Sequence, residues 1–202
     1  MDSDWKDIVR NTYNKVANNY SDTRGIFLNT EYLDKFAALL KPGASVLDLG
    51  CGAGVPVDKF LVDKGFKVTG IDLSESQIRL AKKNVPEGMF DVKDMSDLKS
   101  GDYSVDAVVS FYAIFHVPRE THLGLFQKIY SFLTDDGVML VTMATTDWEG
   151  VDEDFYGEKM FESHYEPVKN TEIVREAGFE ILLDTIDTSG NEKHQVILAR
   201  KH

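Results

Sequence analysis

The chain has 202 residues, of which 22 are Lys or Arg and 34 are Asp or Glu, so its formal net charge is −12. A length of about 200 residues suits one domain, and a hydrophobic fraction of 43% excludes a disordered chain. The negative charge disfavours nucleic acids and anionic membranes as partners, because phosphate groups bind mainly through Lys and Arg.

Cysteine content and local hydropathy narrow the class of protein further. Cys51 is the single cysteine, so no internal disulfide forms, and no Cys/His cluster has the spacing of zinc ligands. The first residues lack the apolar core of a signal peptide, and no apolar run approaches the roughly 18 residues of a membrane span. We expect a cytoplasmic protein with no metal, no membrane and no nucleic acid as partner.

The N-terminal 43 residues predict two helices, at 4–19 and 29–40, which a Lys-Pro-Gly breaker closes. We expect this part, residues 1–43, to form a helical flank or lid. Alternating strands and helices follow it. Apolar runs rich in Val, Ile and Leu predict buried strands at 44–49, 67–71, 88–92, 105–110 and 137–143, and helical patterns lie between them at 55–64, 74–84 and 119–133. This order indicates an α/β domain with a mostly parallel, doubly wound sheet.

The C-terminal part departs from this repetition. Residues 145–170 have no clear period and mix aromatic with acidic residues, so we expect an insertion on the substrate side. A short helix at 171–177 and two strands at 179–186 and 195–199 complete a single domain over residues 1–202.

The most informative segment joins the first strand to the first helix and reads Asp48-Leu49-Gly50-Cys51-Gly52-Ala53-Gly54. Glycine allows a tight turn and lets a backbone approach a ligand closely, and the following helix presents free N–H groups. The GxGxxG loop of dinucleotide-binding domains would need a third glycine at position 55, which is Val55. The loop instead resembles motif I of the class I S-adenosylmethionine-dependent methyltransferases.

Asp72 ends the second strand, about 20 residues after the loop, where an acid accepts hydrogen bonds from ribose hydroxyls. This spacing alone suits either type of cofactor, and Asp72 also stands where it would cap the helix that begins near Ser74. The stretch from Val46 to about Met143 carries the resemblance.

The resemblance implies a Rossmann-like seven-stranded sheet in the order 3-2-1-4-5-7-6, with the last strand antiparallel. It also implies S-adenosylmethionine as the cofactor. Asp48 would order the loop or face the ammonium group of the cofactor, Asp94 and Met95 would contact adenine, and Cys51 would be a small filler rather than a nucleophile. Tyr20 would close over the methionine moiety, although packing alone also explains it. The expected cofactor-binding residues are Tyr20, Asp48, Gly50, Cys51, Gly52, Gly54, Asp72, Leu73, Asp94, Met95 and Phe111.

His116 is the natural candidate for a general base, because neutral imidazole accepts a proton near pH 7 and the residue follows the fourth strand. A histidine beside Val117-Pro118 also suits a packing or capping role. His164, in the insertion, is an equal rival. Methyl transfer needs few catalytic residues, since the cofactor supplies the reactive centre.

The fourth strand ends in Ser110-Phe111-Tyr112-Ala113 rather than the Asn/Asp-Pro-Pro-aromatic tetrapeptide of enzymes that methylate DNA bases. The resemblance therefore indicates methyl transfer to a small-molecule acceptor. A nicotinamide-dependent oxidoreductase and a non-catalytic S-adenosylmethionine-binding module are the alternatives. The acceptor atom and the oligomeric state stay open.

Overall fold

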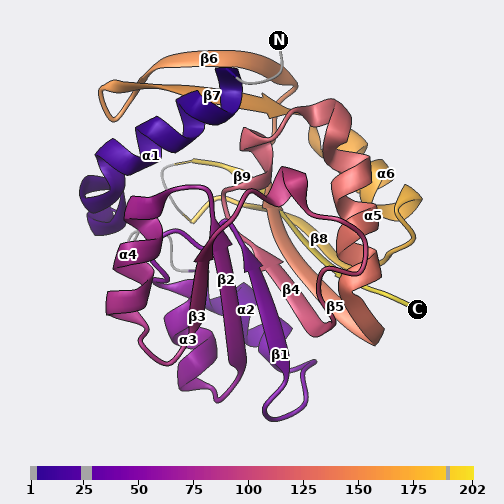
Figure 1. The fold of residues 1–202 in the computed structure, drawn as a ribbon. Helices are drawn as coiled ribbons and strands as arrows, with labels where there is room; N and C mark the ends of the chain where they lie inside the picture. Colours follow the sequence, from indigo (N-terminus) through magenta and orange to yellow (C-terminus); the bar gives the residue numbers. More distant parts are fainter. Residues whose placement is uncertain (1–3, 24–28, 190–191) are drawn as a thin grey trace.

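The computed structural model describes residues 4–23, 29–189 and 192–202. Its centre is a seven-stranded sheet in the order β3-β2-β1-β4-β5-β9-β8 (Figure 1). The strands are β1 (Ser45–Leu49), β2 (Lys67–Asp72), β3 (Met89–Val92), β4 (Val105–Ser110), β5 (Leu133–Met143), β8 (Glu180–Asp187) and β9 (His194–Arg200). The first five run parallel, and β9 is antiparallel to both of its neighbours. The predicted fold class and strand order are confirmed.

Helices cover both faces of the sheet because successive strand residues point to opposite sides. Leu47 and Leu49 of β1 pack in one core cluster with α5 (His122–Phe132) and α6 (Pro167–Glu176). Val46, the residue before Leu47, packs on the other side with α2 (Thr30–Ala37) and α3 (Val57–Asp63). A third cluster joins α4 (Glu75–Asn84) to β3. The helix α2, which the sequence grouped with the lid, is therefore part of the sheet's cover.

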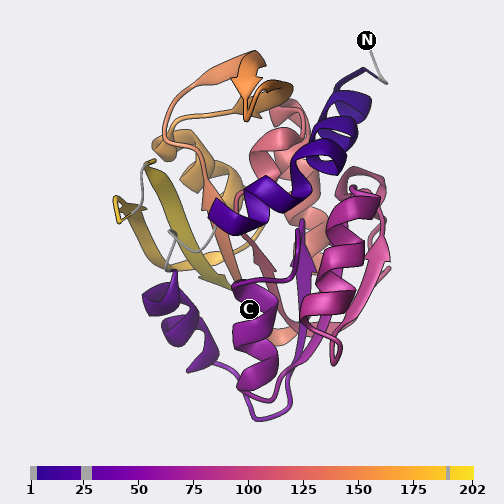
Figure 2. The ribbon, with the colours of Figure 1, turned by 90° about the vertical axis from the view of Figure 1, so that its left-hand side faces the viewer.

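The first helix, α1 (Asp4–Thr23), crosses the end of the sheet at which the parallel strands terminate (Figure 2). Two strands lie beside it, β6 (Trp148–Phe155) and β7 (Glu158–His164), which form an antiparallel hairpin. The Thr12 hydroxyl of α1 donates to the Lys159 carbonyl of β7 over 2.5 Å. The described part of the chain contains no helix with the length and hydropathy to cross a membrane.

The structure corrects the predicted boundaries after the fourth strand. Residues 145–170, which were expected to form an insertion, contain the β6–β7 hairpin, and α6 begins at Pro167, with Glu166 as its N-cap, rather than at residue 171. The hairpin escaped detection because most of β6 is exposed, so its residues do not alternate between apolar and polar. The predicted helix 119–133 begins with a short 3-10 turn at Arg119–Thr121, and its last residue already belongs to β5.

Candidate functional site

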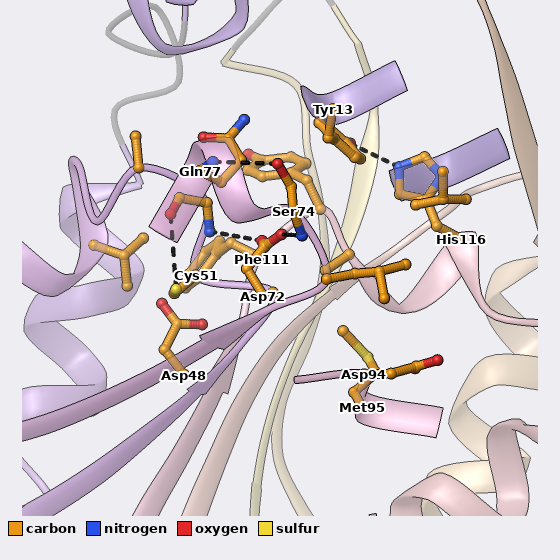
Figure 3. A pocket seen from close by; sticks show the side chains of 18 of the residues that line it. Tyr13, Asp48, Cys51, Asp72, Ser74, Gln77, Asp94, Met95, Phe111 and His116 are labelled. Atoms are coloured by element: carbon orange, nitrogen blue, oxygen red, sulfur yellow. Dashed lines mark hydrogen bonds between the residues drawn. The ribbon is translucent and has the colours of Figure 1, made fainter. Parts of the chain in front are cut away.

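A cavity opens where the parallel strands end, beneath α1 (Figure 3). Such a position suits ligand binding because, in doubly wound sheets, the loops at the carboxyl ends of the strands diverge and leave a crevice. Most of the residues predicted for the site line this cavity: Asp48, Gly50, Cys51, Gly52, Asp72, Leu73, Asp94, Met95, Phe111 and His116. Gly54 and His164 lie outside its lining, and the side chain of Tyr20 lies outside the described residues.

The glycine loop passes close to the segment that follows β4. Gly50 has a φ of +78°, and a Cβ added there would lie 2.3 Å from Cβ of Ala113. Gly52 also has a positive φ, of +54°, but its open side meets only Oε1 of Gln77, at 3.9 Å. Gly50 therefore lets the loop pack against Ala113, and Gly52 leaves room for a ligand against the backbone.

Gly54 serves a different purpose from the cofactor contact that was expected. A Cβ at this position would meet Val85 and Ala81 of α4 at 3.1 and 3.4 Å, and its φ is +75°. The residue thus allows the loop to pack closely on α4, because the loop has already turned away from the cavity.

Asp72 fastens the loop to the end of β2. Its Oδ2 accepts a hydrogen bond from the Gly52 N–H over 2.9 Å, and its Oδ1 accepts one from the Ser74 N–H over 2.8 Å. Burial raises the pKa of the carboxyl to about 6, although these N–H donors oppose the shift. Ser74, rather than Asp72, caps α4 as its N-cap and accepts a hydrogen bond from the Gln77 N–H. Asp72 keeps its place in the lining of the cavity.

Asp48 does not order the loop in the way that was expected. Its Oδ1 is buried and has no hydrogen-bond partner among the described residues. Burial raises the pKa of this carboxyl to about 7, while a hydrogen bond from Asp58 lowers it and the negative charge of Asp72 raises it. Asp58, in α3, was not predicted as a site residue.

Cys51 has the properties of a filler. Its thiol is buried, and burial together with the negative charges of Asp58, Asp72 and Asp48 raises its pKa well above the ordinary value. A thiolate nucleophile needs the opposite shift, so the expected packing role agrees with the electrostatics.

Asp94 and Met95 lie on the far side of the cavity, after β3. Asp94 begins a 3-10 turn and accepts a hydrogen bond from the Ser96 N–H over 2.7 Å. Its other oxygen pairs with the Lys6 ammonium of α1 at 2.7 Å. Lys6 also pairs with Asp97 at 2.8 Å, so α1 is held against the site that was predicted for adenine.

Gln77 is a site residue that sequence reasoning missed. Its side chain lines the cavity, is 1% exposed, and has no hydrogen-bond partner for either amide atom among the described residues. Buried amides in folded proteins are almost always hydrogen-bonded. An unpaired amide at the wall of a cavity therefore indicates a ligand contact.

His116 meets Tyr13 at the side of the cavity that α1 covers. The Nδ1 atom of His116 lies 2.8 Å from the Phe161 carbonyl, and its Nε2 lies 2.9 Å from the Tyr13 hydroxyl. Because a carbonyl only accepts, Nδ1 carries the proton of the neutral ring, and Nε2 accepts from the tyrosine. Burial lowers the pKa of His116 and keeps the ring neutral near pH 7.

His164, the other predicted catalytic residue, is held within the hairpin. Its Nδ1 lies 2.5 Å from the Thr146 carbonyl, its Nε2 is 3.8 Å from Glu162, and the side chain is buried. The structure therefore distinguishes the two histidines, because His116 lines the cavity and His164 does not.

The rest of the cavity wall comes from α1. Trp5, Val9 and Tyr13 recur at intervals of four along one face of the helix and point into the cavity. This spacing alone does not mark the three residues as site residues, since an amphipathic helix shows the same spacing when it packs on a core.

Comparison with known proteins identifies the family of the chain. A family model described as a methyltransferase domain matches residues 26–183. Cyclopropane mycolic acid synthase MmaA2 of Mycobacterium tuberculosis is 31% identical over 110 residues, which cover 52% of this chain and 38% of that protein. The 2-methyl-6-phytyl-1,4-hydroquinone methyltransferase of Synechocystis is 35% identical over 117 residues, covering 56% of this chain and 35% of that protein. The chain thus spans less than half the length of these relatives.

A solved structure shows the same fold over nearly the whole chain. Magnesium protoporphyrin IX methyltransferase of Synechocystis, with bound S-adenosylhomocysteine, has a TM-score of 0.73 at 20% identity and covers 98% of this chain and 100% of that one. The family model covers most of the sequence, including every strand from β1 to β7. The chain belongs to the methyltransferase domain family.

Proposed function

We propose that the chain is an S-adenosylmethionine-dependent methyltransferase that acts on a small-molecule acceptor. The observation that carries this proposal is the hydrogen bond from the Gly52 N–H to Asp72. It holds a carboxylate suited to ribose hydroxyls beside a loop that leaves room for a ligand. Family membership supports it, and so do the names of the relatives.

The residues around the cavity fit this cofactor. Gly52 leaves room for the cofactor against the backbone, Gly50 lets the loop pass close to Ala113, and Asp72 offers its carboxylate to the ribose hydroxyls. Gln77 supplies a buried amide that needs a partner, and Asp94 with Met95 stands where adenine is expected. Leu73, Phe111 and Cys51 complete the apolar wall.

S-adenosylmethionine, when bound, supplies an electrophilic methyl group. The chain's own contribution is to orient the acceptor and take its proton. Tyr13 presents its hydroxyl to the cavity, and the neutral His116 behind it accepts a proton at Nε2 while Nδ1 stays bonded to the Phe161 carbonyl. His116, helped by Tyr13, is the general base of this proposal.

The acceptor side of the cavity favours an apolar, flat compound. Trp5, Val9 and Val117 line it together with the rings of Tyr13 and His116. The hydroquinone methyltransferase of Synechocystis is one relative whose name describes such a substrate. We propose that α1 and the β6–β7 hairpin roof this side and select the acceptor.

Calorimetry with S-adenosylmethionine, S-adenosylhomocysteine and NAD tests the assignment. We expect both sulfur compounds to bind in a 1:1 ratio, and NAD to show no heat of binding. Binding of NAD alone would instead favour the oxidoreductase alternative, in spite of Val55 in place of the third glycine. The cytoplasmic location and the absence of a nucleic-acid partner stay predictions.

A further inference from the structure

Two buried carboxyl groups lie beneath the glycine loop. Asp48 lies in β1 with 2% of its surface exposed, and Asp58 lies in the first turn of α3 with 0% exposed. The loop between them reverses the chain, so the helix brings Asp58 back against the strand. Asp48 lines the cavity, and Figure 3 shows it next to Cys51.

Asp48 and Asp58 lie within hydrogen-bonding reach of each other. Neither oxygen of Asp58, nor Oδ1 of Asp48, receives a bond from another N–H or O–H group. Two carboxyls bond to each other only when one of them keeps its proton. Burial, and then the neighbouring Asp48, raises the pKa of Asp58 well above its ordinary value, so Asp58 is the member that keeps the proton and donates.

The other titratable groups that face the pair supply no positive charge. They are the carboxylate of Asp72, from the end of β2, and the thiol of Cys51, from the loop. No Lys, Arg or His of the described residues forms an ion pair with Asp48 or Asp58. A buried carboxylate without a cation is costly, so an ionised Asp48 needs a positive group from the cavity.

We propose that Asp58 is a positioning residue that stays protonated and donates a hydrogen bond to Asp48. Asp48 then loses its own proton when the cofactor binds and meets the α-ammonium group of the cofactor as a carboxylate. The inference rests on the proposed function. The charges balance, because the ammonium enters with one positive charge and one proton leaves Asp48 for the solvent.

Proton counting by calorimetry tests this without any measurement of activity. S-adenosylhomocysteine is titrated into the protein in two buffers that differ in ionisation enthalpy, at about pH 6 and about pH 8. The comparison ligand is 5′-methylthioadenosine, which keeps the adenosine part that reaches Asp72 but lacks the ammonium group. Because the pKa of Asp48 is about 7, S-adenosylhomocysteine should release close to one proton more than the comparison ligand at the lower pH, and few more at the higher pH.

Two variants of one position separate donation from packing. Asp58→Asn keeps a donor and should preserve both the affinity and its pH profile. Asp58→Leu keeps the branched shape without the donor, so the midpoint of the profile should rise by about one to two pH units. At pH 7 its affinity should fall by about tenfold. Asp63→Asn, an exposed position in the same helix, is the matched control that should change neither.

The outcomes are distinct from those that test the function itself. If S-adenosylhomocysteine does not bind the wild-type protein, the proposed function fails. If it binds but releases no more protons than 5′-methylthioadenosine near pH 6, or if Asp58→Leu keeps the wild-type profile, only the role of Asp58 is overturned.

Discussion

Replacing Asp72 by Asn should make the protein more stable at pH 8 while it weakens cofactor binding. The amide has the shape of the carboxyl and, like its protonated form, offers one acceptor and one donor. It therefore reproduces the neutral state of Asp72, in which only one of the Gly52 and Ser74 N–H groups finds an acceptor. The variant therefore removes the charge and one hydrogen-bond acceptor, as protonation of Asp72 does.

The gain in stability follows from the pKa of Asp72, which burial raises from 3.8 to about 6. A carboxyl with a raised pKa contributes stability below its unfolded pKa and loses that contribution as the pH rises through the folded value. The ionised wild-type side chain thus lowers the free energy of unfolding at pH 8 by up to about 3 kcal/mol. The difference between variant and wild type should shrink below pH 6 and vanish near pH 4.

Cofactor binding should respond in the opposite direction. Hydrogen bonds from hydroxyls to a carboxylate contribute about 1.5–3 kcal/mol, which corresponds to a loss of about 10- to 150-fold in affinity. Urea denaturation of the ligand-free protein at several pH values measures the first effect, and calorimetry with S-adenosylhomocysteine measures the second.

Asp91→Asn is the matched control for this pair of measurements, since Asp91 is exposed on the neighbouring strand β3. It should leave stability and affinity unchanged. Unaltered affinity in Asp72→Asn would remove Asp72 from the cofactor site, and a loss of stability at pH 8 would refute the electrostatic argument.

Three further predictions concern the loop, the proposed base and a buried histidine. Gly50→Ala should abolish cofactor binding, because its Cβ would lie 2.3 Å from that of Ala113. The control Gly43→Ala has a similar φ of +75° and nothing within 4 Å, so it should lose only about 1–2 kcal/mol of stability, the cost of a left-handed residue. Equal losses of stability for the two variants in denaturation would contradict the close approach at Gly50. His116→Gln should lower kcat by about 10²- to 10⁴-fold and leave the Kd of S-adenosylhomocysteine unchanged, with a smaller effect for Tyr13→Phe; unchanged turnover would exclude the base. Burial lowers the pKa of His122 from 6.5 to about 4. The free energy of unfolding should therefore fall by about 3 kcal/mol as the pH falls from above 6.5 to 4. In His122→Gln, which has no titrating group at this position, denaturation curves should show this decrease to be smaller by about 3 kcal/mol.

The parallel core of the fold was predictable because its strands are buried on both faces. In the sequence, β1, β2 and β4 are short apolar runs, and such runs are typical of strands that are buried on both faces of a parallel sheet. The β6–β7 hairpin was not predictable for the opposite reason. Its exposed acidic residues give no period, and α1, far away in the sequence, is the element that it packs against.

The candidate site likewise contains residues that the sequence marks and residues that only the structure brings to the site. Glycines and acids at strand ends stand out in a sequence, so Gly50, Gly52 and Asp72 were found. Asp58 and Gln77 are polar residues within helices, where such residues usually face the solvent, and only the packing of α3 and α4 on the loop turns them inward. A polar side chain on the buried face of a helix carries no local signal that marks it as functional.

Turnover is the most direct test of the central claim. The protein is incubated with S-adenosylmethionine labelled in the methyl group and with a metabolite extract, and boiled protein serves as the blank. The account predicts that S-adenosylhomocysteine accumulates above the blank and that the label appears in a small molecule. Tight binding of the cofactor without S-adenosylhomocysteine above the blank, across extracts and pH values, would contradict it and leave a protein that only binds the cofactor.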